Sequence, residues 1–94
     1  METNTIIAPA ELCSTNSRQW KDRITKDLAS PPNEVLIDLS NTRFIDSSGL
    51  GVLLSLNKTL HAQGCTLKLP NPSIAAAQLI ELTRLHRVFA IVHS

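Results

Sequence analysis

The residues with the clearest capacity for chemistry lie together at 46–49, in the order Asp46-Ser47-Ser48-Gly49. An apolar strand pattern at 35–39 comes before them and an apolar helical pattern follows directly, so they fall where a helix begins. Hydroxyl groups at that point lie beside backbone N–H groups that lack helical partners and beside the positive end of the helix dipole. They can cap the helix, act as nucleophiles, or accept a phosphate group.

Nucleophilic catalysis by these serines is not supported by the surrounding residues. The glycines of a G-x-S-x-G nucleophile elbow are not in place around them. His61 falls on the same predicted helix 13 residues after Ser48, about 20 Å along its axis and out of hydrogen-bond reach. His86 and His93 could reach the serines only through the tertiary fold. We therefore do not expect an enzyme.

Nucleotide, metal and disulfide sites are not indicated either. Gly49 and Gly51 are too close together for G-x-x-x-x-G-K-[ST] or G-x-G-x-x-G, and no lysine follows in register. The aspartates and the three histidines show no metal-ligand spacing. Cys13 and Cys65 lie 52 positions apart without a CxxC pair, which favours two reduced, partly buried thiols. We expect no cofactor and no metal.

The composition bounds the class of protein. Ninety-four residues form one domain, and with 3% aromatic residues its core must be aliphatic. Nine basic and eight acidic residues are spread along the chain without a basic run, so nucleic acid is not an expected partner. There is no signal-peptide pattern and no apolar run near the ~20 residues of a membrane span. We expect a soluble, cytoplasmic protein without membrane insertion.

Extended and helical patterns alternate along the chain. Trp20, Ile24 and Leu28 form a stripe on one helix, which Ser14-Thr15-Asn16 can cap, and Gly64 is the expected C-terminal cap of the central helix. The alternation predicts an α/β fold with a largely parallel sheet. The predicted strands are 5–12 (interrupted by Pro9), 35–39, 65–69 and 88–92, with a brief extended piece at 44–45, and the helices end near 29, 63 and 85.

A purely structural reading also accounts for the motif. In it, Asp46, Ser47 and Ser48 cap the central helix, and Gly49 and Gly51 let that helix pack closely on the sheet. Spacing alone favours this reading over a functional one.

The residues around the motif favour a functional reading. The segment 46–54, DSSGLGVLL, after the strand 35–40, VLIDLS, resembles the signature of STAS domains, specifically of bacterial anti-sigma factor antagonists. The resemblance continues through 67–73 and 79–89 and covers roughly 5–92. It implies a single STAS-like domain over 1–94, with a four- to five-stranded mixed sheet, helices mainly on one face, and no catalysis of its own.

The resemblance also implies a function. In that family, the first serine after the aspartate, which matches Ser47, is phosphorylated by an anti-sigma factor with serine kinase activity. The unmodified protein binds that factor and releases the sigma factor, whereas the phosphoprotein does not. Ser48 is then expected to cap the helix, and Gly49 to keep the backbone open where the partner approaches. The implied partner-binding residues are Asp46, Ser47, Ser48, Gly49 and Leu50.

The chain departs from the family pattern at two places. Cys13 stands where a Gly-Glu-Leu-Asp pattern has its aspartate, and the additional strand with which members usually begin has no room before Thr5. An exposed sheet edge would result, which is compatible with a homodimer. The alternative function is a scaffold of the same fold in a transporter or sensory complex, in which Ser47 is only a cap.

Overall fold

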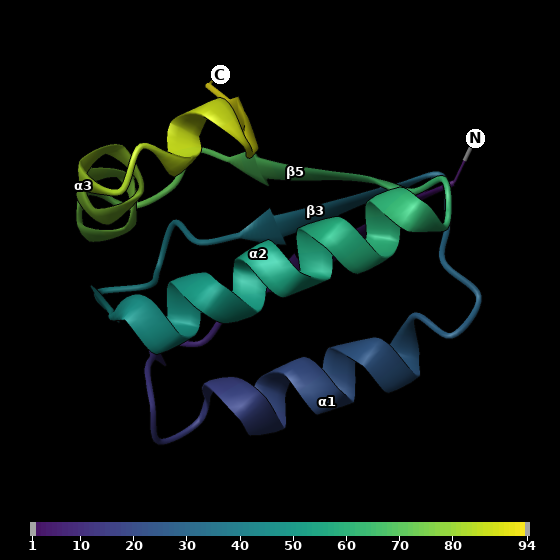
Figure 1. Ribbon diagram of the computed structural model, residues 1–94, viewed down its shortest axis with the longest axis horizontal. Coiled ribbons are helices and arrows are strands. Elements are labelled where there is room, and N and C mark those ends of the chain that lie inside the picture. Colours follow the sequence, from purple (N-terminus) through teal and green to yellow (C-terminus); the bar gives the residue numbers. More distant parts are fainter. Residues whose placement is uncertain (1, 94) are drawn as a thin grey trace.

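Helices and strands alternate along the computed structural model, which describes residues 2–93 (Figure 1). The strands are β1 (Thr3–Ile7), β2 (Glu11–Leu12), β3 (Glu34–Asp38), β4 (Phe44–Ile45), β5 (Thr66–Pro70) and β6 (Ala90–Val92). The helices are α1 (Ser17–Asp27), α2 (Ser47–Ala62) and α3 (Ile74–Leu82), with a 3₁₀ helix, η1 (Leu85–Arg87). The α/β class expected from the sequence is confirmed.

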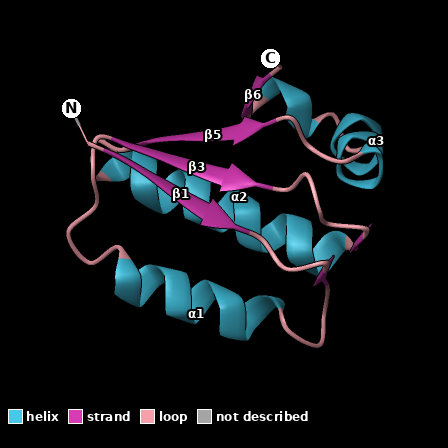
Figure 2. Cartoon of the chain, turned by 180° about the vertical axis from the view of Figure 1, so that it is seen from behind, coloured by secondary structure: helices cyan, strands magenta, loops and turns pink. Residues whose placement is uncertain are grey.

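Four strands form the main sheet, in the order β1-β3-β5-β6 (Figure 2). Every pairing among the described residues is parallel, including that of the small separate β2-β4 sheet. The largely parallel sheet inferred from the alternation is therefore confirmed, and the structure differs from the mixed sheet that the resemblance implied. The parallel arrangement follows because each crossover returns the chain to the same edge before the next strand begins.

The predicted strand at 5–12 is in fact two strands in different sheets. Ala8 still donates its N–H to the carbonyl of Asp38 at 3.0 Å, but Pro9 has no N–H to continue the ladder. The carbonyl of Pro9 instead accepts from the buried Thr42 hydroxyl at 2.9 Å. A strand thus lies ahead of the segment 11–12, at Thr3–Ile7, within the stretch that the sequence analysis predicts as a single strand.

Helices α1 and α2 lie on the same side of the sheet and pack against each other (Figures 1 and 2). In Figure 2 no helix lies in front of β1, β3 and β5, so the helices cover mainly one face, as expected. The alternation of β3 explains this arrangement, because Val35 and Ile37 are fully buried while the other three residues of the strand are only half-buried. The stripe formed by Trp20, Ile24 and Leu28 is buried in the same aliphatic core.

The C-terminus of α2 ends as the sequence predicts. Gly64 has a φ of +78° and donates its N–H to the carbonyl of His61 at 3.0 Å. Cys65 donates to the carbonyl of Leu60 at 2.9 Å, which completes a Schellman motif. Both cysteines are free: Cys65 is buried and Cys13 is half-buried.

None of the helices in the described part of the chain combines the length and the apolar character that crossing a bilayer requires.

Candidate functional site

The motif lies at the turn between β4 and α2. Asp46 is the residue before the helix, with an extended backbone, and its Oδ1 accepts the N–H of Gly49 at 3.0 Å. An N-cap side chain reaches the N–H group three positions onward in this way, which satisfies one of the unpaired donors of the first turn. Asp46 is therefore the helix cap, and the expectation that Ser48 caps the helix was wrong.

The second carboxylate oxygen of Asp46 holds another part of the chain. Oδ2 accepts the N–H of Ser14 at 3.1 Å, and the N–H of Asp46 donates to the carbonyl of Leu12 at 3.3 Å. These bonds join the start of α2 to the loop that follows β2. Hydrogen bonds from backbone N–H groups, with that of Gly49 the largest contribution, hold the pKa of the Asp46 carboxyl below its ordinary value. The carboxyl is charged at neutral pH as a result.

Exposure divides the motif into two groups. The side chains of Ser47 and Ser48 are exposed, and Asp46 is half-buried. Gly49 and Leu50 are buried, Leu50 to 4% exposure, so neither offers a surface for direct contact with another protein. Three of the five residues expected to bind a partner thus lie at the surface, and two lie beneath it.

The two glycines of the motif have different roles. Gly49 lies against the backbone of β2, where a methyl group would overlap the carbonyl oxygen of Leu12. The close approach that requires this glycine is therefore intramolecular, and its expected role toward a partner stays a prediction. Gly51 is exposed, and a Cβ there would meet nothing within 4 Å. The structural reading of the sequence is thus correct for Gly49 and wrong for Gly51.

The loop between β2 and α1 carries Cys13 next to Ser14, whose N–H is bonded to Asp46. The shape of this loop is set by Asn16. Its Oδ1 accepts the N–H of Cys13 at 2.9 Å, and its Nδ2 donates to the carbonyl of Glu11 at 2.7 Å. Asn16 stands at the N-cap position of α1 without a side-chain cap bond. The sequence analysis predicts that this segment caps the helix. The side-chain amide of Asn16 instead closes the loop beside the motif.

Helix α3 is bonded to the loop that precedes β4 and the motif, a contact that the sequence analysis does not predict. Ser73 caps α3 by accepting the N–H of Ala76 at 3.1 Å. The same hydroxyl donates to the carbonyl of Thr42 at 2.6 Å, in the loop that leads into β4. A serine at a helix start signals the cap, but nothing in the local pattern signals this contact across 31 residues.

The structure does not bring the histidines to the serines. His61 lies on the last turn of α2, while Ser47 is its first residue. His86 and His93 line a cavity whose lining contains no residue of 46–50. Among residues 2–93 no three His, Cys, Asp or Glu side chains are grouped as metal ligands.

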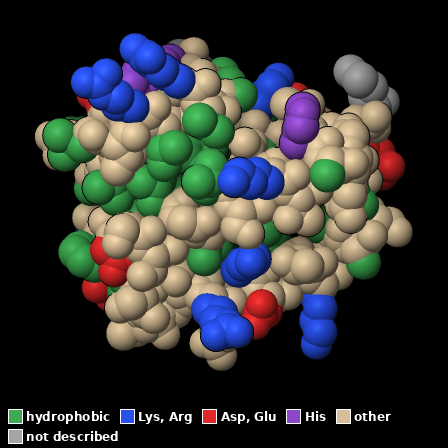
Figure 3. Space-filling model, viewed as in Figure 1, with side chains coloured by type: hydrophobic (Ala, Val, Ile, Leu, Met, Phe, Trp, Pro, Cys, Tyr) green, Lys and Arg blue, Asp and Glu red, His purple; other side chains and the backbone are tan. Residues whose placement is uncertain are grey.

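A partly apolar surface extends from the motif. Ser47, Gly51 and Lys58 are exposed and Leu54 is half-buried, at spacings that place all four on one side of α2. In the view of Figure 3, hydrophobic side chains gather on this face of the molecule, bordered by basic residues and a histidine. Leu82, at the end of α3, is 81% exposed, and Val88, after η1, is 50% exposed. Apolar side chains that gather in a patch are typical of surfaces that bind other proteins, whereas single exposed ones are ordinary.

Comparison with known proteins agrees with the resemblance found in the sequence. A model of the STAS domain family matches residues 5–94. The crystal structure of a candidate anti-sigma factor antagonist from Thermotoga maritima is 26% identical, with a TM-score of 0.83; the match covers 96% of this chain and 79% of that one. The NMR structure of the protein TM1081 is 25% identical with the same TM-score, covering 96% of this chain and 73% of that one.

Proposed function

Because the chain belongs to the STAS domain family, we propose that it is an anti-sigma factor antagonist that phosphorylation of Ser47 switches off. Its partner is an anti-sigma factor with serine kinase activity, met in the cytoplasm, and the protein itself catalyses no reaction. The observation that supports this function best is the position of Ser47, exposed as the first residue of α2. A kinase can approach a hydroxyl at such a place without unfolding its substrate.

The local bonding is compatible with a phosphate on Ser47. Asp46, not Ser47, supplies the cap of α2, so modification of the Ser47 hydroxyl leaves that cap intact. A phosphate adds ~1.5–2 negative charges at neutral pH, and the start of a helix tolerates an anion. We therefore expect the modified domain to stay folded, so that the modification acts on binding.

The effect on binding is electrostatic. The charged carboxylate of Asp46 adjoins Ser47, so a phosphate there concentrates negative charge on an exposed turn. A partner surface that fits a neutral hydroxyl would have to accommodate a solvated dianion. A loss of ~3 kcal/mol in binding free energy would weaken affinity more than a hundredfold, which is enough to release the partner.

Burial suggests how the five expected residues share the work. Asp46, Ser47 and Ser48 would contact the partner directly, together with the exposed side of α2 that carries Gly51. Gly49 and Leu50, which are buried, would contribute indirectly by packing α2 against the rest of the domain.

A phosphorylation assay tests the switch. The purified chain is incubated with ATP and each candidate anti-sigma kinase from the same cell, and its intact mass is measured. We expect one phosphate on the wild type and on Ser48→Ala, and none on Ser47→Ala. Ser48→Ala is the matched control, because it removes the neighbouring exposed hydroxyl. A phosphate that maps to Ser48 would disprove the assignment to Ser47.

A binding titration tests the consequence. Ser47→Asp should bind the kinase partner more than about a hundredfold more weakly than the wild type, whereas Ser47→Ala should bind as the wild type does. If Ser47→Asp binds unchanged and no kinase adds a phosphate, the switch is wrong. A non-phosphorylated scaffold in a transporter or sensory complex then becomes the better description.

A further inference from the structure

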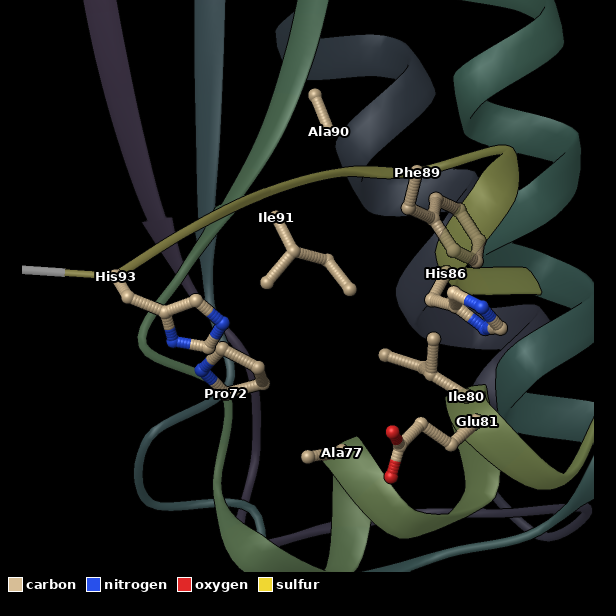
Figure 4. A pocket seen from close by; sticks show the side chains of 9 residues that line it. All are labelled: Pro72, Ala77, Ile80, Glu81, His86, Phe89, Ala90, Ile91 and His93. Carbon is tan, nitrogen blue, oxygen red and sulfur yellow. The ribbon is translucent and has the colours of Figure 1, made fainter. Parts of the chain in front are cut away.

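A cavity of about 580 Å³ lies between α3, η1 and β6, apart from the Ser47 motif. Figure 4 shows Ile91 of β6 and Ile80 of α3 pointing toward each other across it, with Phe89 at one end. Ile80 and Phe89 belong to the buried core behind the cavity, so its accessible apolar surface comes from residues such as Pro72, Ala77 and Ile91. Its volume falls within the roughly 300–1,000 Å³ of pockets that hold small molecules.

The cavity lies at the carboxyl ends of two parallel strands. Pro72 follows the end of β5 and His93 follows the end of β6, and both line the cavity. The loops that follow these two strands therefore form part of the cavity wall at this edge of the sheet.

The rim of the cavity has few polar groups, and Glu81 is the only Asp, Glu, Lys or Arg residue among them. Glu81 and His86 lie on one side in Figure 4, and His93 lies on the opposite side, next to Pro72. No Lys or Arg lines the cavity. The carboxylate of Glu81 has no salt bridge to any residue within 2–93. Imidazole rings donate and accept hydrogen bonds and present flat faces for stacking.

We propose that this cavity binds a small aromatic ammonium compound, a ligand site that goes beyond the proposed switch at Ser47. The flat apolar body would lie against Pro72, Ala77 and Ile91, which line the cavity and are half-buried, and the ammonium group would face the carboxylate of Glu81. For a probe of this size, the affinity of an open pocket corresponds to a Kd on the order of 1 mM. Because Glu81 is exposed, its charge contributes a factor of about two to five to that affinity.

Tryptamine is a suitable probe, and indole-3-propionate is its anionic counterpart with the same ring. The full chain, labelled with ¹⁵N, is titrated with each compound, and the amide shifts are followed. We expect saturable shifts at Ala77, Ile91 and His93, with tryptamine binding about two to five times more tightly than the anion. Absence of saturable shifts at these amides up to about 10 mM tryptamine would overturn the proposal.

Variants separate the cavity from nonspecific binding. Glu81→Gln should abolish the preference for tryptamine, whereas Glu11→Gln, at an exposed carboxylate of β2, should keep it. Ile91→Trp should fill the cavity and eliminate binding, and Ala77→Leu does the same on α3 in case the first variant disturbs β6. Tighter binding of indole-3-propionate, or an unchanged preference in Glu81→Gln, would refute the cationic class of ligand.

Discussion

The carboxylate of Asp46 accepts a hydrogen bond from the backbone N–H of Ser14, 32 residues earlier, at 3.1 Å. Its other oxygen caps α2 through the N–H of Gly49. One side chain therefore sets both the entry of the helix and the loop after β2. The backbone around Ser47 is thus fixed by hydrogen bonds within the domain itself.

The contribution of Asp46 to stability should depend on pH. Its folded-state pKa is below the ordinary value of 3.8, because the N–H groups of Gly49 and Ser14 bond the charged form. The stabilisation is then present above about pH 3.8 and is lost as the pH falls through the lower, folded value. Urea unfolding at pH 7 and pH 3 should show a loss in the wild type that is smaller in Asp46→Asn.

A carboxylate on the exposed side of α1 provides the control for this measurement. Asp22→Asn should retain the pH dependence of the wild type. Equal losses in the wild type and Asp46→Asn would show that the two hydrogen bonds of Asp46 do not favour its charged form.

The two glycines of the motif should respond in opposite directions to the same substitution. Gly49→Ala forces a methyl group into the carbonyl of Leu12 and should lower the free energy of unfolding by about 1–3 kcal/mol. Gly51→Ala meets open space on an exposed helix and should raise it by about 0.5–1 kcal/mol, because alanine favours helix more than glycine does. Urea denaturation followed by circular dichroism measures both. A neutral Gly49→Ala would mean that β2 can move away from α2.

The hydroxyl of Ser73 should contribute more to the free energy of unfolding than a surface hydroxyl does. Ser73→Ala loses the cap of α3 and the 2.6 Å bond to Thr42, at a cost of about 1–2 kcal/mol in the free energy of unfolding. Thr59→Ala, at an exposed position of α2, should stay within about 0.5 kcal/mol of the wild type. If the two variants are equal, the bond between α3 and the loop before β4 contributes nothing.

The two thiols should react at different rates. Burial, and then the negative charge of Glu34, raise the pKa of Cys65, which is 2% exposed, whereas Cys13 is half-buried. Since the thiolate is the reactive form, Cys65 should react with a disulfide reagent at pH 8 at least about ten times more slowly than Cys13. Cys13→Ser should remove the fast phase only. A fast phase that remains in that variant would contradict the burial of Cys65.

Local patterns were sufficient where one segment determines its own structure. The stripe of Trp20, Ile24 and Leu28 identifies the buried side of α1, and Gly64 marks the end of α2, because both signals depend on neighbouring residues in one helix. The family was also recognised from the DSSGLG segment in its strand–helix context, and the match over residues 5–94 confirms it.

Contacts between distant segments explain what the sequence analysis missed at Pro9 and at Gly49. Pro9 predicted an interruption, but only the separate partners β3 and β4 show that the chain changes sheets there. Ser48 is a good cap by residue type, yet Asp46 occupies the cap position and also reaches Ser14. The carbonyl of Leu12, which requires glycine at position 49, lies 37 residues earlier in the chain, so no local pattern indicates this contact.

The sequence by itself determined the α/β class, the family and the presence of hydroxyls at the start of the central helix. These properties follow from hydrophobic period and residue type, which act within a few residues of the chain. Only the tertiary structure decided which members of the motif face solvent, which carboxylate oxygen holds which loop, and where a cavity opens beside β6. Burial and side-chain partners depend on segments that meet only after the sheet has formed, so short-range patterns carry no record of them.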